Sequence, residues 1–223
     1  MTAPAPATAY TLYADRQYAS PYALSVFVAL TELGLPFALR TLDLAAGEQA
    51  SADFAAQSRT RLVPCLVQTD AAGHTWALSE SSAITEYLQD THPQACLYPA
   101  AAPDKALARQ VQAWLRSDLL PLRAERPTDV IFCPGARAWP PLSEAAQAAC
   151  AKLFAAAQSW LGDGREHLLG RAWCLADTDL ALMLQRLICA GDAVPDTLRH
   201  YAQRQWQRPS VQAWCALPRP ASV

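Results

Sequence analysis

Residues 61–88 read RLVPCLVQTDAAGHTWALSESSAITEYL, and this stretch decides the predicted fold. Pro64 precedes a short apolar run, residues 65–67, that is typical of a buried strand. Because proline cannot donate to a sheet ladder, we expect Pro64 at the entry of the strand. A cis bond after Val63 would leave the Val63 backbone free to pair with a peptide-like ligand. The Gly-containing loop 70–74 then predicts a hairpin to a second strand at 75–77.

A polar segment, Ser79-Glu80-Ser81-Ser82, follows the hairpin and is rich in residues that cap helices. Ile84 and Leu88 come next at helical spacing, so a helix is expected to start here. The free N–H groups at a helix start attract carboxylates. Beside a strand edge that can pair with backbone, such a site suits a small peptide that bears its own amine and carboxylate.

The residues before this stretch predict further strands and helices. Residues 10–13 have strand propensity, and Ser20 and Pro21 mark the cap and first position of a helix that ends at Gly34. Residues 37–43 alternate as a half-buried strand, and 51–58 predict a short helix. The order is strand, helix, strand, helix, strand, strand, helix, with a proline entering the third strand. This is the layout of an α/β thioredoxin-like domain.

The second half of the chain predicts helices alone. The segment 92–103 contains three prolines and is typical of a linker, which gives a first domain at 1–92, a linker at 93–103 and an all-helical domain at 104–223. Helices are expected from Asp104, over 143–161 and from about Asp177 to Ala190, followed by two short ones. The side chains expected to point inward from the first of these are Leu107, Val111, Trp114, Leu115 and Leu119.

Composition excludes several classes of function. The chain has 223 residues, a net charge of −2 and 18 scattered Lys and Arg, so no nucleic-acid footprint is present. No apolar run is long enough to span a membrane, and residues 1–10 do not resemble a signal peptide, which predicts a cytoplasmic protein. The seven cysteines form no C-x-x-C pair, and with four dispersed histidines they predict neither a disulfide framework nor a metal site.

Three short motifs carry a resemblance to a known family. Glutaredoxins have Cys-Pro-Tyr-Cys at their first helix, where this chain has Ser20-Pro21-Tyr22-Ala23 and lacks both sulfurs. Together with Val63-Pro64 and the segment 78–84, this motif resembles the glutathione S-transferases, especially the bacterial members that use a serine. The segment 173–177, Trp-Cys-Leu-Ala-Asp, stands where that family begins a buried helix with a capping box, although Cys174 replaces the usual Ser or Thr. The resemblance covers nearly the whole chain.

The resemblance implies that glutathione is a cosubstrate, with no built-in cofactor. Its sulfur would face Ser20, the catalytic candidate, because a hydroxyl donor and a helix N-terminus both favour the thiolate. By the family pattern the Val63 backbone would pair with the cysteinyl unit of glutathione, and Pro64, the next residue, would belong to the same site. Glu80 and Ser81 would hold the γ-glutamyl amine and carboxylate. Arg61 is a candidate for the glycyl carboxylate, and Tyr13 is the alternative to Ser20 as the group that activates the thiol.

A second, electrophilic substrate would bind in a cleft to which Tyr22, Trp114 and Asp118 are assigned as candidates. The charges at Arg116, Arg123, Glu125 and Arg126 are interpreted as a solvated face, with a polar substrate pocket or a subunit interface as alternatives.

Three functions are compatible with this sequence. The first is a glutathione transferase that conjugates electrophiles or reduces peroxides or disulfides. The second is a non-catalytic interaction or stress protein with the same fold. The third is a glutathione-dependent isomerase or dehalogenase, although the serine-cysteine turn of the zeta-like isomerases is missing around Ser20. As in the family, a homodimer is expected.

Overall fold

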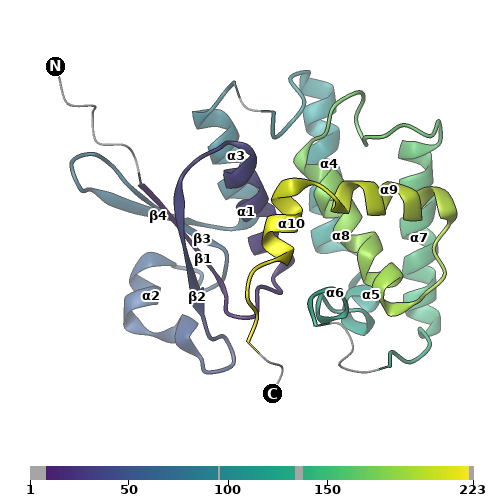
Figure 1. Cartoon of the computed structure of the whole chain (residues 1–223), viewed down its shortest axis with the longest axis horizontal. Helices are drawn as coiled ribbons and strands as arrows, with labels where there is room; N and C mark the ends of the chain where they lie inside the picture. The colour runs from purple at the N-terminus through teal and green to yellow at the C-terminus, as the bar shows by residue number, and fades with distance from the viewer. Residues whose placement is uncertain (1–8, 95, 134–137, 221–223) are drawn as a thin grey trace. The chain divides into compact units, whose positions relative to one another are not determined.

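A computed structural model of the chain describes residues 9–94, 96–133 and 138–220, shown in Figure 1. The chain divides into two compact units. The first comprises Met1–Pro93 with Leu217–Pro220, and the second comprises Gln94–Ala216 with Ala221–Val223.

The first unit contains a four-stranded mixed sheet. Its strands are β1 (Ala9–Asp15), β2 (Phe37–Leu42), β3 (Cys65–Thr69) and β4 (Thr75–Ser79), in the order β2-β1-β3-β4. β1 runs parallel to β2, whereas β3 runs antiparallel to both of its neighbours. The bond between Val63 and Pro64 is cis, as the sequence predicts. The α/β fold class and the predicted order of elements are confirmed.

Helices cover both faces of this sheet. α1 (Pro21–Glu32) packs against α3 (Ser81–Thr91) on one face, and the short α2 (Ala52–Gln57), preceded by the 3-10 helix η1 (Glu48–Ala50), lies on the other (Figure 1). Side chains alternate along β1, as a strand requires. Leu12 and Ala14 are fully buried, and Tyr13 packs against Phe54 of α2 with ring centroids 5.4 Å apart.

α1 begins and ends as its sequence predicts. The Ser20 hydroxyl accepts a hydrogen bond from the Ala23 N–H at 3.2 Å, and Pro21 occupies the first turn, where its missing N–H costs nothing. After the last turn Gly34 takes a φ of +63°, a backbone conformation that glycine adopts without a side-chain penalty. Most of the helix between these ends is buried.

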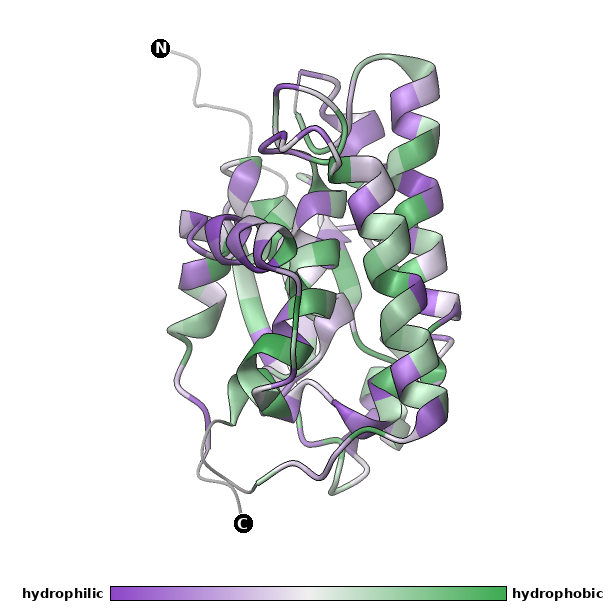
Figure 2. Ribbon diagram, turned by 90° about the vertical axis from the view of Figure 1, so that its right-hand side faces the viewer, coloured by the Kyte–Doolittle hydropathy of each residue, from purple (hydrophilic) through white to green (hydrophobic). Residues whose placement is uncertain are grey.

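The second unit is helical throughout its described elements. These are α4 (Ala102–Ser117), α5 (Leu120–Glu125), α6 (Asp129–Phe132), α7 (Glu144–Leu161), α8 (Leu175–Ala190), α9 (Asp196–Trp206) and α10 (Pro209–Cys215). α8 is buried on nearly all sides and packs against α4, α6 and α9. Green and purple residues lie next to each other along the long helices in Figure 2, as expected for helices with one face in a core.

Asp177 fixes the start of α8. Its carboxylate accepts hydrogen bonds from the backbone N–H of Cys174 at 2.9 Å, the N–H of Leu168 at 2.7 Å and the hydroxyl of Tyr201 at 2.7 Å. The bond from Cys174 is the carboxylate half of the capping box that the segment 173–177 resembles. Burial, followed by the nearby Asp177 charge, raises the pKa of Tyr201 well above its usual value, so this phenol stays a donor.

Some expectations for the helical unit are wrong. α4 begins two residues earlier than expected, at Ala102, and Leu107, expected to point inward, is 43% exposed. The interpretation of the charges at Arg116, Arg123, Glu125 and Arg126 as a solvated face is wrong for one of them, because Arg126 is buried and paired with Asp192. All seven cysteines are free thiols.

Candidate functional site

The sheet register brings three candidate segments to one end of the first unit. Tyr13, near the end of β1, pairs with Cys65 at the start of β3, and Cys65 also pairs with Ser79 at the end of β4. Pro64 directly precedes Cys65, Glu80 directly follows Ser79, and the turn to Ser20 leaves the end of β1. Segments far apart in sequence therefore meet at the end of the sheet where β1 and β4 end and β3 begins.

The turn between β1 and α1 is held by a carboxylate that the sequence analysis did not single out. Asp15 is 5% exposed, and its two oxygens accept hydrogen bonds from the backbone N–H groups of Ala19 at 2.7 Å and Ser20 at 2.9 Å. Tyr18 in this turn has a φ of +49°. Its carbonyl accepts a bond from Arg219 at 3.3 Å. An Asp at the end of a strand and five residues before a capping Ser is a signal that could have identified this turn.

Ser20 is half-buried and stands at the N-terminus of α1. Because its Oγ atom accepts the Ala23 N–H, the hydroxyl keeps its own proton for donation outward. The positive end of the helix dipole lies at the same place. Tyr13, the alternative candidate, has its ring on the α2 face of the sheet against Phe54, and half-buried Tyr22 lies in the first turn of α1.

Hydrogen bonds of hydroxyl groups hold the loop that carries Arg61 and Val63. Ser58 is fully buried, and its Oγ lies 2.8 Å from Ser79 Oγ and 3.4 Å from the Leu62 carbonyl. Burial raises the pKa of the neighbouring Cys65 thiol, although hydrogen bonds from Ser79 and Ser58 oppose the rise. No local pattern marks the Ser58–Ser79 pair, because its members are 21 positions apart.

Arg61 and Val63 differ in exposure. Arg61 is exposed with a φ of +54°, and its N–H donates to the Ser58 carbonyl at 3.1 Å. Val63 is half-buried and packs against the cluster of Phe54 and Cys65 on the α2 face. The loop thus presents the exposed Arg61 guanidinium and the Val63 backbone, which the Val63 side chain anchors to the α2 face.

Glu80 and Ser81 open α3 in a strained geometry. Glu80 takes φ +73° and ψ +115°, a combination that non-glycine residues rarely adopt and that tends to persist where a ligand is held. Its side chain is exposed, whereas Ser81 is 4% exposed. The residue that caps α3 is Glu80, and it makes no side-chain cap bond. The first turn of α3 therefore offers N–H groups to an anion.

The remaining candidates belong to the second unit. Trp114 packs edge-on against Trp160, with centroids 5.6 Å apart, and its indole N–H donates to Asp118 at 2.9 Å. Asp118 also accepts from the backbone of Leu119 and pairs with Lys152 of α7. Lys152, followed by these two donors, lowers the pKa of Asp118 to about 2. This carboxylate therefore joins α4 to α7.

Two absences concern the described residues only. In that part of the chain, no three His, Cys, Asp or Glu side chains gather as a metal site would require. Nor does any helix described there have the length and apolar character that crossing a membrane demands.

Comparison with known proteins assigns the family. Residues 19–91 match the family described as the glutathione S-transferase N-terminal domain, and residues 102–219 match the glutathione S-transferase C-terminal domain. The chain belongs to the glutathione S-transferase family. The family and the transferase assignment expected from the sequence are confirmed.

Among solved structures, this transferase resembles a glutathione transferase homologue from a Burkholderia, described with bound glutathione. The two are 45% identical, with a TM-score of 0.72 over 92% of this chain and 95% of that one. A maleylacetoacetate isomerase from Anaeromyxobacter dehalogenans, described with glutathione in its active site, is 25% identical, with a TM-score of 0.68 over 93% and 95% of the two chains. A curated maleylacetoacetate isomerase from Dictyostelium discoideum is 34% identical over 77 residues, which span 34% of this chain and 33% of that protein.

Proposed function

We propose that the first unit of this transferase binds glutathione at the end of the sheet where β1 and β4 end and β3 begins. The glutathione sulfur would lie at Ser20. The observation that carries the proposal is the register that joins Cys65 to both Tyr13 and Ser79, since it gathers the Ser20 turn, Val63 and Glu80–Ser81. The Burkholderia relative, 45% identical and described with bound glutathione, supports the choice of ligand.

Ser20 is proposed as the residue that stabilises the thiolate. A free thiol has a pKa of about 8.5 and is mostly protonated at neutral pH. The Ser20 hydroxyl, positioned by its bond from Ala23, would donate to the sulfur, and the α1 dipole would add to the effect. Tyr13 is the weaker candidate, because its ring packs on Phe54 beneath α2.

The other residues would hold the tripeptide. The Val63 backbone would pair with the cysteinyl unit, and its side chain is anchored on the α2 face. The first turn of α3, with Glu80 and Ser81, would bind the γ-glutamyl carboxylate and amine. Arg61, exposed on the same loop as Val63, would reach the glycyl carboxylate.

The reaction we propose is conjugation. The glutathione thiolate attacks an electrophilic carbon, a carbon–sulfur bond forms, and a leaving group such as halide departs with the bonding electrons. The protein contributes positioning and stabilisation of charge, so that glutathione is a cosubstrate and no built-in cofactor is invoked. Tyr22, Trp114 and Asp118 stay predictions for contacts with the electrophile, and reduction of peroxides or disulfides would use the same thiolate.

A second candidate is glutathione-dependent isomerisation. It is favoured by the match of 77 residues at 34% identity to a maleylacetoacetate isomerase. The sequence Ser20-Pro21-Tyr22-Ala23 lacks the serine-cysteine turn of the zeta-like isomerases, so conjugation ranks first.

The experiment is calorimetric titration with glutathione, followed by turnover of an aryl halide and of maleylacetoacetate in separate assays. Binding with aryl halide turnover supports the proposal, and turnover of maleylacetoacetate alone would select the isomerase. Binding without either turnover would favour an interaction protein, and absence of binding would overturn the proposal. We further propose a cytoplasmic homodimer, and light scattering that shows a monomer of about 24 kDa would contradict the dimer.

A further inference from the structure

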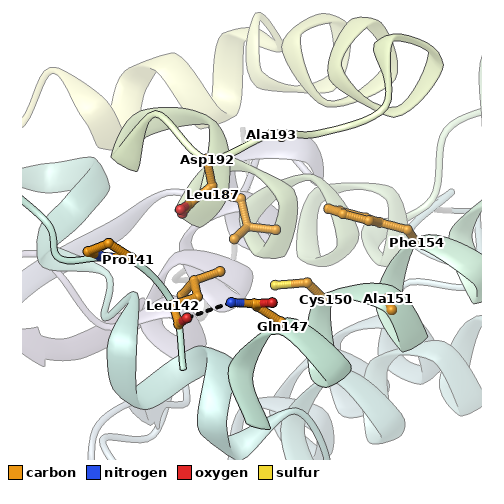
Figure 3. A pocket seen from close by; sticks show the side chains of 9 residues that line it. All are labelled: Pro141, Leu142, Gln147, Cys150, Ala151, Phe154, Leu187, Asp192 and Ala193. Carbon is orange, nitrogen blue, oxygen red and sulfur yellow. Dashed lines mark hydrogen bonds between the residues drawn. The ribbon is translucent and has the colours of Figure 1, made fainter. Parts of the chain in front are cut away.

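A cavity of about 400 Å³ lies wholly within the helical unit and uses none of the residues proposed for glutathione. It is bounded by α7, the end of α8 and the segments that precede α7 and follow α8 (Figure 3). Its volume is within the range of small-molecule sites. The residues that line this Cys150 pocket are Pro141, Leu142, Gln147, Cys150, Ala151, Phe154, Leu187, Asp192 and Ala193.

Most of the pocket wall is apolar. Leu142 and Leu187 extend into the space from opposite sides, and the Phe154 ring borders it from α7 (Figure 3). Cys150 is 7% exposed and lies on the α7 side of the same space. Binding of a ring or alkyl chain to apolar surfaces of this kind is favourable, because it displaces water from them.

Asp192 places a carboxylate on this otherwise apolar wall. Its oxygens accept from Arg126 Nε at 2.6 Å and Nη2 at 2.8 Å. The Arg126 side chain is 2% exposed and that of Asp192 is 18% exposed, so the cation is enclosed and the anion is the accessible partner. Arg126 also donates to the Pro140 and Glu125 carbonyls. Because a carboxylate has about four acceptor positions, Asp192 keeps capacity for another donor.

The surroundings supply a second acceptor. The nearby charges balance, because the Asp192 and Glu125 carboxylates face Arg126 and also Arg186, whose Nη1 donates to the Arg126 carbonyl at 2.7 Å. Burial raises the pKa of Cys150 to about 11, and the charges of Asp192 and Glu125 contribute to the rise, while Arg126 opposes it. Gln147 donates its amide nitrogen to the Leu142 carbonyl at 2.8 Å, which leaves its amide oxygen as an acceptor beside the pocket (Figure 3).

We propose that the Cys150 pocket is a second ligand site, which binds a small apolar amine in its protonated form. The ring or alkyl part of the amine lies between Leu142, Phe154 and Leu187. Its ammonium group donates to the Asp192 carboxylate and to the Gln147 amide oxygen. Burial of the apolar part and a charge-assisted hydrogen bond then act together, and an anion of the same shape is rejected.

The test compares three probes of nearly equal shape on the full-length chain by calorimetry or ligand-observed NMR. These are 2-phenylethylamine, 2-phenylethanol and 3-phenylpropionate. The amine is expected to bind roughly tenfold or more tightly than the alcohol, because it gains a charge-assisted bond. The carboxylate is expected not to bind. Equal binding of all three probes, or absence of binding by the amine, would overturn the proposal.

Two alanines of α7 provide matched variants that localise the binding. Ala151 and Ala155 are both exposed, but only Ala151 lines the pocket. Ala151→Phe is expected to fill the space and abolish amine binding, whereas Ala155→Phe retains it. Unchanged amine affinity in Ala151→Phe, with the same thermal unfolding as Ala155→Phe, would place the amine elsewhere and refute the site. A substitution of Asp192 would also leave the buried Arg126 guanidinium without its counter-charge, so it would not separate binding from folding.

Discussion

Asp15 and Ser20 are joined by a hydrogen bond of 2.9 Å from the Ser20 backbone N–H to the Asp15 carboxylate. The bond spans the turn between β1 and α1, and a second bond from Ala19 at 2.7 Å fixes the same carboxylate. Since Asp15 is 5% exposed, its carboxylate depends on these two N–H donors rather than on water. The start of α1, and with it the Ser20 hydroxyl, is therefore set by a residue of the preceding strand.

Asp15→Ala is expected to destabilise the protein by about 1.5 to 3 kcal/mol, because a charged acceptor is lost and two N–H groups of the turn lose their partner. Urea denaturation measures this loss. Asp53→Ala, which changes an exposed carboxylate of α2, serves as the control. Equal stability of the two variants would show that the turn does not depend on Asp15.

Ser20→Ala tests the thiolate proposal against a matched cap. Ser51 caps α2 with the same geometry, accepting the Phe54 N–H at 3.3 Å. Both Ser20→Ala and Ser51→Ala are expected to cost about 1 kcal/mol of stability. Only Ser20→Ala should raise the pKa of bound glutathione, measured by the ultraviolet absorbance of the thiolate across pH, and lower turnover most near neutral pH. If both variants keep the wild-type pH profile, Ser20 is a cap alone and Tyr13 is the next residue to change.

Ser81→Ala is expected to weaken glutathione binding by roughly one to two orders of magnitude. The reason is the loss of a bond to a ligand carboxylate, worth about 1.5 to 3 kcal/mol when charge-assisted. Ser82→Ala, at the next position of α3, is the control and should bind as the wild type does. Calorimetry with glutathione measures both affinities, and an unchanged Ser81→Ala affinity would remove Ser81 from the site.

Local signals explain what the sequence predicted well. Ser20 and Pro21 mark a helix start through their own chemistry, and Pro64 marks the entry of β3 because it cannot donate to a ladder. The apolar run 65–67, followed by the Gly-containing loop 70–74, predicts the hairpin. Each of these signals is contained within a few neighbouring residues, so no tertiary information is needed to detect it.

Other features depend on contacts between distant residues. Glu80 adopts its positive φ although nothing in the segment 79–82 requires it, so this backbone conformation was not predicted. Arg126 is buried because Asp192, 66 positions later, neutralises it. The Cys150 pocket likewise combines residues from 141 to 193. Helical periodicity identified Val111 and Leu115 as buried but placed the exposed Leu107 on the same face, since a stripe does not show where packing ends.

Acid is expected to weaken the link between α4 and α7. The pKa of Asp118 is lowered to about 2 in the folded protein, first by Lys152, whereas the unfolded value is 3.8. The charged carboxylate therefore stabilises the fold at pH values above about 4, and this contribution is lost as the pH falls from about 4 to about 2. Thermal unfolding of wild type and Asp118→Asn should differ at pH 6 and converge on acidification. A difference that is constant with pH would contradict the link.

Asp192→Asn is expected to destabilise the helical unit strongly, because it leaves the Arg126 guanidinium buried without a counter-charge. Loss of one partner of a buried ion pair costs about 3 to 5 kcal/mol. Asp163 offers a matched comparison, since it accepts from Arg165 Nε at 2.8 Å and Nη2 at 2.6 Å in the same two-bond geometry but on the surface. Asp163→Asn should therefore cost far less, because water solvates the stranded Arg165.

Urea denaturation of both variants gives the comparison, and equal losses of stability would show that burial of Arg126 carries no penalty.

A double variant separates the effect of the charge from that of the packing. Replacing both members, as Arg126→Met with Asp192→Leu, removes the unpaired charge and should lose less stability than Asp192→Asn alone. If the double variant is instead the least stable, the hydrogen bonds from Arg126 to the Pro140 and Glu125 carbonyls, rather than the charge, hold this part of the helical unit together.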